Sequence, residues 1–162
     1  MIGSLNSMSY LKPHSLFDKI FVWLKRTQKV DIKEQYEKYN VRAFDFHFYF
    51  VGSSKKTIFK YYGIEYETFS IYEILNYLNS KNNVYARVVL EDNSKNINLE
   101  KCFIEYCQKI ESIYPKIKFF GGYRENDSKH LYNFKYDTPD NLVFYKRVDK
   151  LNNTLIGVWC NW

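Results

Sequence analysis

The spacing of apolar residues changes along the chain between the two-residue repeat of β-strands and the three-to-four-residue repeat of amphipathic helices. Strand-like sequence, alternating or rich in β-branched and aromatic residues, is present over residues 1–4, 41–51, 57–62, 84–90, 117–120, 131–136 and 142–148. Helical spacing is present over residues 15–25, 31–34, 70–78 and 98–114. Residues 154–162 are apolar without a clear period. Because strands and helices alternate, the pattern predicts an α/β fold with a mostly parallel sheet.

Residues at the expected helix ends support these assignments. Asp31 is followed three residues later by Glu34, which is typical of a helix start with an acidic cap. Ser70 and Glu73 have the spacing of a capping box and predict the next start. Pro115 predicts the end of the 98–114 helix, because a proline disfavours helical geometry in the residue before it.

The length and composition indicate one domain, spanning residues 1–162. The chain has 162 residues, 46% of them hydrophobic, which is enough for a single substantial core. It has no apolar run of the roughly eighteen residues that a membrane-spanning helix needs, and Met1-Ile2 leads directly into strand-like sequence rather than a signal peptide. We therefore expect a soluble chain. Cys102 and Cys107 have the spacing of neither a disulfide framework nor a metal site, so we expect reduced thiols.

The net charge of +6 and the aromatic content of 20% leave nucleic acid and anionic membranes open as partners. The basic residues are scattered, and the adjacent pairs are few, such as Lys25-Arg26 and Lys55-Lys56. Most tyrosines and phenylalanines fall at core spacings, so packing explains them better than base stacking. No nucleic-acid motif is present, and we expect no nucleic-acid binding.

Three segments carry polar residues at the ends of expected strands. Residues 3–10 read Gly-Ser-Leu-Asn-Ser-Met-Ser-Tyr, residues 41–47 read Val-Arg-Ala-Phe-Asp-Phe-His, and residues 61–63 read Tyr-Tyr-Gly. This series resembles the phosphatidylinositol-specific phospholipase C (X-domain) family of phosphodiesterases. In that family the first strand ends in G-T-H-N-S or G-T-H-D-S, the second in R-x-F-D-I-R or an E-L-D variant, and the third in H-G. The resemblance covers roughly residues 1–125.

The resemblance implies a TIM-barrel-like fold. Such barrels usually need about 250 residues, so a barrel in this chain must be abbreviated or irregular. In parallel barrels the reactive groups lie at the carboxyl ends of the strands. We therefore expect Asn6, Asp45, Tyr62 and Glu91 to converge at one end of a single parallel sheet. Asp45 and His47 should share a face, because strand side chains alternate with a period of two.

The family mechanism implied by the resemblance uses one histidine as general base and a second as general acid, with an arginine or a calcium ion stabilising the phosphoryl charge. Here the first histidine position holds Leu5, the arginine position His47 and the second histidine position Tyr62. Leucine carries no proton, and a tyrosine with a pKa near 10 is poorly matched to acid–base work at pH 7. The resemblance thus implies a degenerate catalytic site of Asp45, His47, Tyr62 and Leu5, in a pseudoenzyme whose phosphodiester hydrolysis is weak or lost.

The remaining polar residues leave three interpretations open. Asp45 and His47 could pair structurally inside the barrel mouth, hold a metal, or contact a phosphate directly. The resemblance places the calcium ligands of eukaryotic members at Asn6, Asp45, His47 and Glu91, although histidine suits a transition metal better than calcium. Asn6 and Arg87 are the candidate substrate-binding residues. His14 and His130 are candidates for a relocated base.

The expected partner is a phosphoinositide or another phosphodiester head group, which would connect the chain to lipid metabolism. The alternative function is a non-catalytic binding module for a phosphorylated head group or a protein partner. The expected helix over residues 15–25 carries Phe17, Phe21 and Trp23, which could contact a membrane surface or pack in the core.

Overall fold

The computed structural model describes residues 1–13, 19, 27–51, 56–61, 64–65, 71–92, 95–151 and 157–158. Eight strands form one sheet in this part of the chain. They are β1 (Ile2–Ser4), β2 (Ala43–Val51), β3 (Lys56–Tyr61), β4 (Ile64–Glu65), β5 (Val84–Leu90), β6 (Ile117–Arg124), β7 (Val143–Tyr145) and β8 (Gly157–Val158). The helices are α2 (Ile32–Glu37), α3 (Ile71–Asn79), α4 (Ile97–Ile113) and the 3₁₀ turn η2 (Val148–Lys150).

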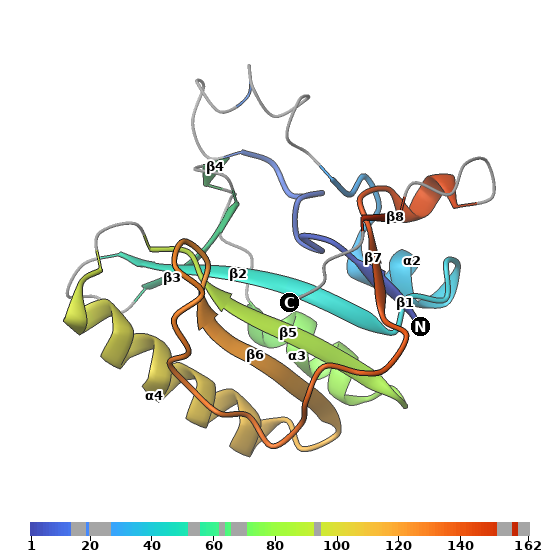
Figure 1. Ribbon diagram of the computed structural model, residues 1–162. Helices are drawn as coiled ribbons and strands as arrows, with labels where there is room; N and C mark the ends of the chain where they lie inside the picture. The colour runs from blue at the N-terminus through green and yellow to red at the C-terminus, as the bar shows by residue number, and fades with distance from the viewer. Residues whose placement is uncertain are drawn as a thin grey trace.

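Five neighbouring strands of the sheet run parallel, in the order β7-β1-β2-β5-β6. β8 is antiparallel to β7, and the β3–β4 hairpin adds antiparallel to β2. α3 and α4 lie on the same side of β2, β5 and β6 (Figure 1). The fold is therefore α/β with a mostly parallel sheet, as the alternation of strand and helix patterns predicted.

β1 and β3 share one edge of β2. Phe44 pairs with Ser4 of β1 on one side and with Ala86 of β5 on the other, whereas Phe48 pairs with Phe59 and Leu90. β1 thus ends beside the second residue of β2, and β3 pairs with β2 only from Phe48 onward. Because β1 ends early, the loop after it lies against the face of β2 that points away from α3 and α4. We call this the inner face of the sheet, and the face toward α3 and α4 the outer face.

The outer face of the sheet packs against α3 and α4. Alternate residues of β2 and β5 contribute to this core because strand side chains alternate between the two faces. The core includes fully buried residues of both layers: Phe44, Phe46, Phe48, Val84, Ala86, Val88, Leu75, Leu78, Phe103 and Ile110. Each buried phenylalanine or leucine contributes about 1.5–3 kcal/mol, so this face provides most of the apolar stabilisation.

The inner face holds a smaller apolar cluster that joins the two edges of the parallel sheet. Phe120 from β6 and Phe144 from β7 pack in one cluster with Leu5 and Ala43. β6 and β7 are opposite edges of the parallel strands, so the sheet must curve strongly to bring these rings together. Gly3 makes this possible next to Phe144, because a Cβ at Gly3 would lie 2.7 Å from the Phe144 ring.

The expected helix starts are confirmed where the structure describes them. Asp31 precedes α2, and its side chain accepts a hydrogen bond from the Glu34 backbone N–H at 2.8 Å. α4 starts one residue earlier than expected, because the side chain of Asn96 caps it by accepting from the Asn98 N–H at 2.9 Å. The expected helix over residues 15–25 lies outside the described residues, apart from Lys19.

Two strand predictions differ from the structure. β6 does not stop at the glycine pair but continues to Arg124, with Gly121 and Gly122 at φ angles of 92° and 78°. The expected strand over residues 131–136 is wrong: this segment is irregular. Its first two residues, Leu131 and Tyr132, both donate their backbone N–H to the Gly122 carbonyl. Two successive residues that donate to one carbonyl do not form the regular hydrogen bonds of a β-ladder. The aromatic side chains of this segment pack against the core instead.

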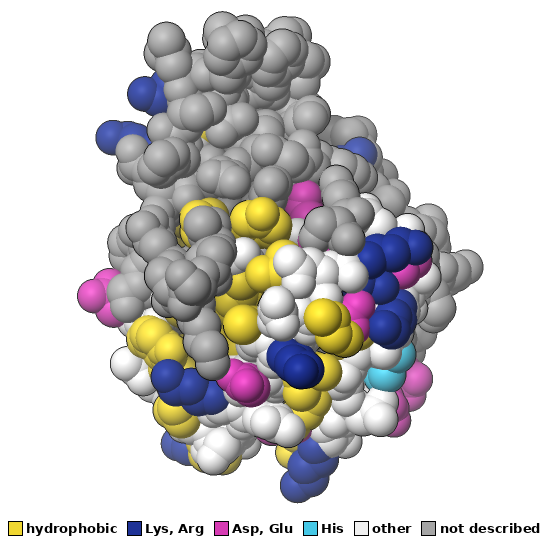
Figure 2. Space-filling view, turned by 90° about the vertical axis from the view of Figure 1, so that its left-hand side faces the viewer, with side chains coloured by type: hydrophobic (Ala, Val, Ile, Leu, Met, Phe, Trp, Pro, Cys, Tyr) yellow, Lys and Arg dark blue, Asp and Glu magenta, His cyan; other side chains and the backbone are white. Residues whose placement is uncertain are grey.

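Basic residues are scattered over the described surface in Figure 2, as they are along the sequence. On the described part of one face, lysine and arginine side chains are interspersed with acidic and apolar ones (Figure 2). Cys102 and Cys107 are free. Within the described ranges, no helix combines the length and apolar character needed to cross a bilayer.

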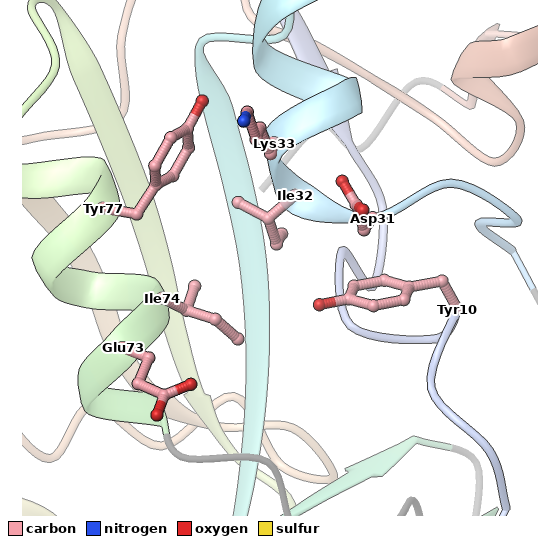
Figure 3. Close-up of a pocket in the computed structure, with 7 residues that line it drawn as sticks. All are labelled: Tyr10, Asp31, Ile32, Lys33, Glu73, Ile74 and Tyr77. Carbon is pink, nitrogen blue, oxygen red and sulfur yellow. The ribbon is translucent and has the colours of Figure 1, made fainter.

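A groove opens between α2, α3 and the loop after β1 (Figure 3).

Candidate functional site

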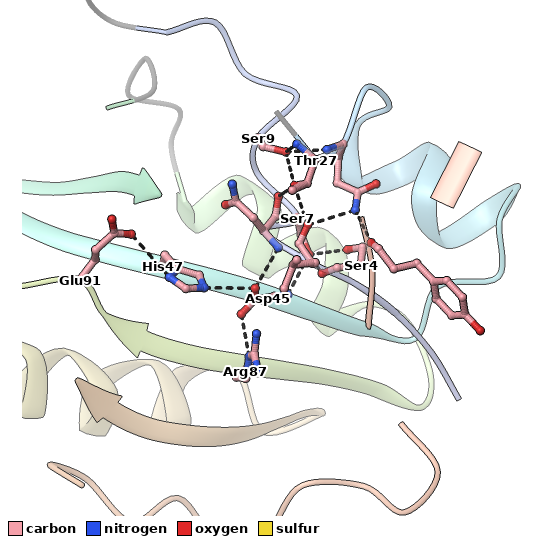
Figure 4. Close-up of polar contacts among 12 residues, drawn as sticks. Ser4, Ser7, Ser9, Thr27, Asp45, His47, Arg87 and Glu91 are labelled. Carbon is pink, nitrogen blue, oxygen red and sulfur yellow. Dashed lines mark hydrogen bonds and ion pairs between the residues drawn. The ribbon is translucent and has the colours of Figure 1, made fainter. Parts of the chain in front are cut away.

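Five polar residues from β2, β5 and the loops that follow β1 and β5 come together inside the curved sheet. Asn6 directly follows β1, Asp45 and His47 lie on β2, Arg87 lies on β5, and Glu91 directly follows β5. The parallel register places Asp45 opposite Arg87. Figure 4 shows the Asp45, His47, Arg87 and Glu91 side chains arranged in one connected row on the inner face. Asn6, Asp45 and Glu91 are thus linked through direct contacts and His47, but Asp45 is the third residue of β2 and does not lie at the carboxyl end of that strand as expected.

Asp45 is at the centre of the cluster, with no solvent exposure. Its Oδ1 accepts a hydrogen bond from Arg87 Nε at 2.8 Å. Its Oδ2 accepts from the Asn6 backbone N–H at 2.8 Å and lies 3.1 Å from His47 Nε2. Both carboxylate oxygens are therefore satisfied by donors from three segments of the chain.

His47 connects Asp45 to a second carboxylate. Its Nδ1 lies 3.5 Å from Glu91 Oε2, and the His47 side chain is 3% exposed. Arg87, Asp45, His47 and Glu91 thus form a row of alternating positive and negative groups, which we call the Asp45 network. With His47 protonated its formal charges cancel, which is the usual condition for keeping ionised groups out of water.

The pKa values of the central pair move in opposite directions. Burial alone would raise the pKa of the Asp45 carboxyl, but Arg87 and His47 outweigh burial and hold it well below its ordinary value. Burial alone would lower the pKa of His47, but Asp45 and Glu91 raise it to about 10. Both groups are therefore charged at neutral pH, and neither is ready to exchange a proton.

The loop after β1 is fixed by hydroxyl and amide groups that the sequence patterns did not single out. Ser7 Oγ accepts from the Asp45 backbone N–H at 2.8 Å and donates to the Ser4 carbonyl at 2.8 Å. Gln28 Nε2 donates to the Leu5 and Tyr145 carbonyls at 3.0 and 2.9 Å. Thr27 Oγ1 donates to the same Leu5 carbonyl at 2.8 Å. These contacts hold the Asn6 N–H in place beside Asp45.

Leu5 occupies an apolar position beside this network. It is buried and packs with Ala43, Phe120 and Phe144. Asn6, the next residue, has a φ of 45°, a left-handed conformation that asparagine adopts more readily than most residues. Within the described residues, the Asn6 side-chain Nδ2 has no hydrogen-bond acceptor although the residue is 3% exposed.

A divalent cation does not fit the Asp45 network in this arrangement. Both Asp45 oxygens take N–H donors, and the Arg87 guanidinium lies where a cation would be repelled. Both ring nitrogens of His47 face carboxylates, and a protonated imidazole cannot ligate a metal. In the described ranges, no group of three or more His, Cys, Asp or Glu residues could hold a metal ion.

Arg87 also borders a small cavity on the inner face. The cavity has a volume of about 60 Å³ and is lined by Arg87, Phe120, Gly121, Tyr123, Thr138, Leu142 and Phe144. The Arg87 guanidinium lies 4.3 Å from the centre of the Phe144 ring. That volume has room for a few water molecules, since one water needs about 10–15 Å³ on this measure.

The other candidate residues are not part of this cluster or cannot be placed. His130 is exposed in the loop after β6, where its backbone bridges to Tyr123. Tyr62, His14, Phe17, Phe21 and Trp23 lie outside the described residues. The strand before Tyr62, β3, runs antiparallel to β2, so Tyr62 does not follow a parallel strand as expected.

Comparison with protein-family models, curated proteins and solved structures finds no match to this chain.

Proposed function

We propose that this chain is a phosphatidylinositol-specific phospholipase C-like domain whose phosphodiester hydrolysis is weak or lost. The observation that carries the proposal is the Asp45 network on the inner face of β2 and β5, beside the loop after β1 and next to a buried Leu5. The resemblance puts the catalytic base at Leu5 and the phosphate-stabilising arginine at His47. Leucine cannot take a proton, and His47 is held charged between two carboxylates.

We further propose that the α/β fold is, more specifically, an abbreviated barrel of the phospholipase C type. β1, β2, β5 and β6 are neighbours in chain order, and β7 returns to the free side of β1. In a closed barrel, the last strand likewise pairs with the first. Contact between Phe120 of β6 and Phe144 of β7 supports a barrel-like curvature. A domain of 162 residues would form such a barrel with fewer repeats than the usual eight.

Two features also support the alternative of a non-catalytic module that binds a phosphorylated head group. Arg87 borders the small inner cavity together with the hydroxyl-bearing residues Tyr123 and Thr138. The Asn6 side-chain amide is a buried donor without an acceptor in the described part of the chain. Arginine and amide donors are the groups that phosphate oxygens accept from. Binding would therefore use the same end of the sheet as the lost reaction.

Hydrolysis of phosphatidylinositol tests the proposal. Purified protein should release cyclic inositol phosphate no faster than its Asp45→Asn variant, both with chelator and with added calcium. Because each acid–base group usually contributes about 10²–10⁴ in rate, an intact site would be easy to detect. Turnover that survives chelator and collapses on His14→Ala or His130→Ala would reveal a relocated base and overturn the proposal.

A further inference from the structure

The groove between α2, α3 and the loop after β1 is separate from the Asp45 network. Its volume is about 360 Å³, within the range of about 300–1,000 Å³ that small-molecule sites usually have. The lining residues are Tyr10, Asp31, Ile32, Lys33, Glu73, Ile74 and Tyr77. Figure 3 shows Tyr10 and α3 facing each other, with Ile32 between them.

The floor and walls of the groove suit an apolar body. Ile32 and Ile74 are 3% and 5% exposed and belong to the outer-face core, so they form a fixed base. Tyr10 and Tyr77 are partly buried and present aromatic rings to the same space. Aromatic rings attract cations through the negative potential of their faces. Tyr77 already does so within the chain, because Lys81 Nζ lies 4.6 Å from its ring centre.

The charge of the lining is opposite to that of the chain. Asp31 and Glu73 supply two negative charges and Lys33 one positive charge, a net of −1, on a chain whose net charge is +6. The negative potential reaches the tyrosines. The pKa of Tyr10 is raised by burial first and then by the Asp31 carboxylate. Asp31 and Glu37 act in the same direction on the pKa of Tyr77, again after burial.

We propose that this groove binds a small organic cation, an ammonium group carried on a compact apolar body. The ammonium is attracted by the Asp31 and Glu73 carboxylates and by the tyrosine rings, while the apolar body covers Ile32 and Ile74. An anion of the same size would be repelled by the two carboxylates, and a neutral molecule would gain no attraction from their charge. This inference does not depend on the proposed function, since it uses none of the residues of the Asp45 network.

A pair of probes of equal shape separates charge from apolar contact. Choline and 3,3-dimethylbutan-1-ol differ mainly in the positive charge of the head. Calorimetric titration of the full chain should give a dissociation constant for choline about two- to fivefold lower than for the neutral alcohol, given about 0.5–1 kcal/mol for an exposed cation–π contact. Backbone amide NMR should place the shifts at residues 31–33 and 73–77. Equal affinity for the two probes, no choline binding up to about 50 mM, or shifts confined to other segments would each overturn the proposal.

Three variants sharpen the test. Glu73→Gln should weaken choline binding by about two- to fivefold, as expected for an exposed ion pair. Lys33→Gln should strengthen it, a gain that partial unfolding cannot produce. Tyr72→Leu is the matched control, because Tyr72 is an exposed tyrosine on α3 outside the groove and should leave the affinity unchanged. If Glu73→Gln and Lys33→Gln both leave binding unaltered, the groove does not select its ligand by charge.

Discussion

Along β2, Phe44, Phe46 and Phe48 face the helices, whereas Asp45 and His47 at the alternate positions face the inside of the curved sheet. The outer face is stabilised by burial, which depends on apolar area and shape more than on any one neighbour. The inner face is stabilised by charges that need specific partners, because an unpaired buried charge is costly. Adjacent residues of one strand should therefore tolerate substitution very differently.

The largest effect is expected from removing the centre of the Asp45 network. Asp45→Ala should lower the free energy of unfolding by about 3–5 kcal/mol, because Arg87 and His47 stay buried after losing the Asp45 carboxylate. Urea unfolding monitored by circular dichroism measures this loss. On the outer face, Ile110→Val should cost only about 0.5–1.5 kcal/mol.

A double variant shows whether the loss comes from unpaired charge. Asp45→Ala with Arg87→Met should be less destabilising than the sum of the single variants, with a coupling of about 0.5–3 kcal/mol. Strict additivity would mean that Asp45 and Arg87 act independently, contrary to the 2.8 Å contact between them.

A smaller loss is expected at the loop that supports Asp45. Ser7→Ala removes the acceptor of the Asp45 backbone N–H and leaves that buried donor unpaired, at a cost of about 1–3 kcal/mol. Ser7→Thr keeps the hydroxyl and is the informative comparison by the same urea titration. If Ser7→Ala unfolds at the wild-type midpoint, the loop does not hold the network in place.

The pH dependence of stability should show the raised pKa of His47. A group whose folded-state pKa is raised stabilises fully below its unfolded value of about 6.5 and stops stabilising as pH approaches about 10. The groups that raise the pKa of His47 against the effect of burial are Asp45, Glu91 and Glu125. Relative to His47→Gln, the wild type should lose at least about 1 kcal/mol between pH 6 and 10. Parallel profiles for the two proteins would contradict the charged state assigned to His47.

The two faces of β2 also differ in how far the sequence predicts them. Period-two alternation was enough to put Asp45 and His47 on one face, and it also explains the apolar outer face. The cap at Asp31 was predictable because capping is local, with its partner Glu34 only three residues away. Such features depend on neighbours in sequence, so a single sequence carries them.

Features that depend on distant partners were not predictable. Arg87 could have faced either side of β5, and the register opposite Asp45 decides this. Ser7, Thr27 and Gln28 carry no local motif, yet they fix the loop after β1 through contacts far apart in sequence. The alternating aromatics of residues 131–136 resemble a strand, but packing against Gly122 keeps the segment irregular.

Restoring the family's three groups tests the central claim most directly. The triple variant Leu5→His, His47→Arg and Tyr62→His replaces the missing base, arginine and acid at the positions that the resemblance assigns. His47→Arg keeps the positive charge between Asp45 and Glu91. Phosphorus NMR of phosphatidylinositol digests should detect cyclic inositol phosphate from the triple variant and from neither the wild type nor any single variant. A triple variant with wild-type circular dichroism and no product would contradict the claim that this end of the sheet derives from a phosphodiesterase site.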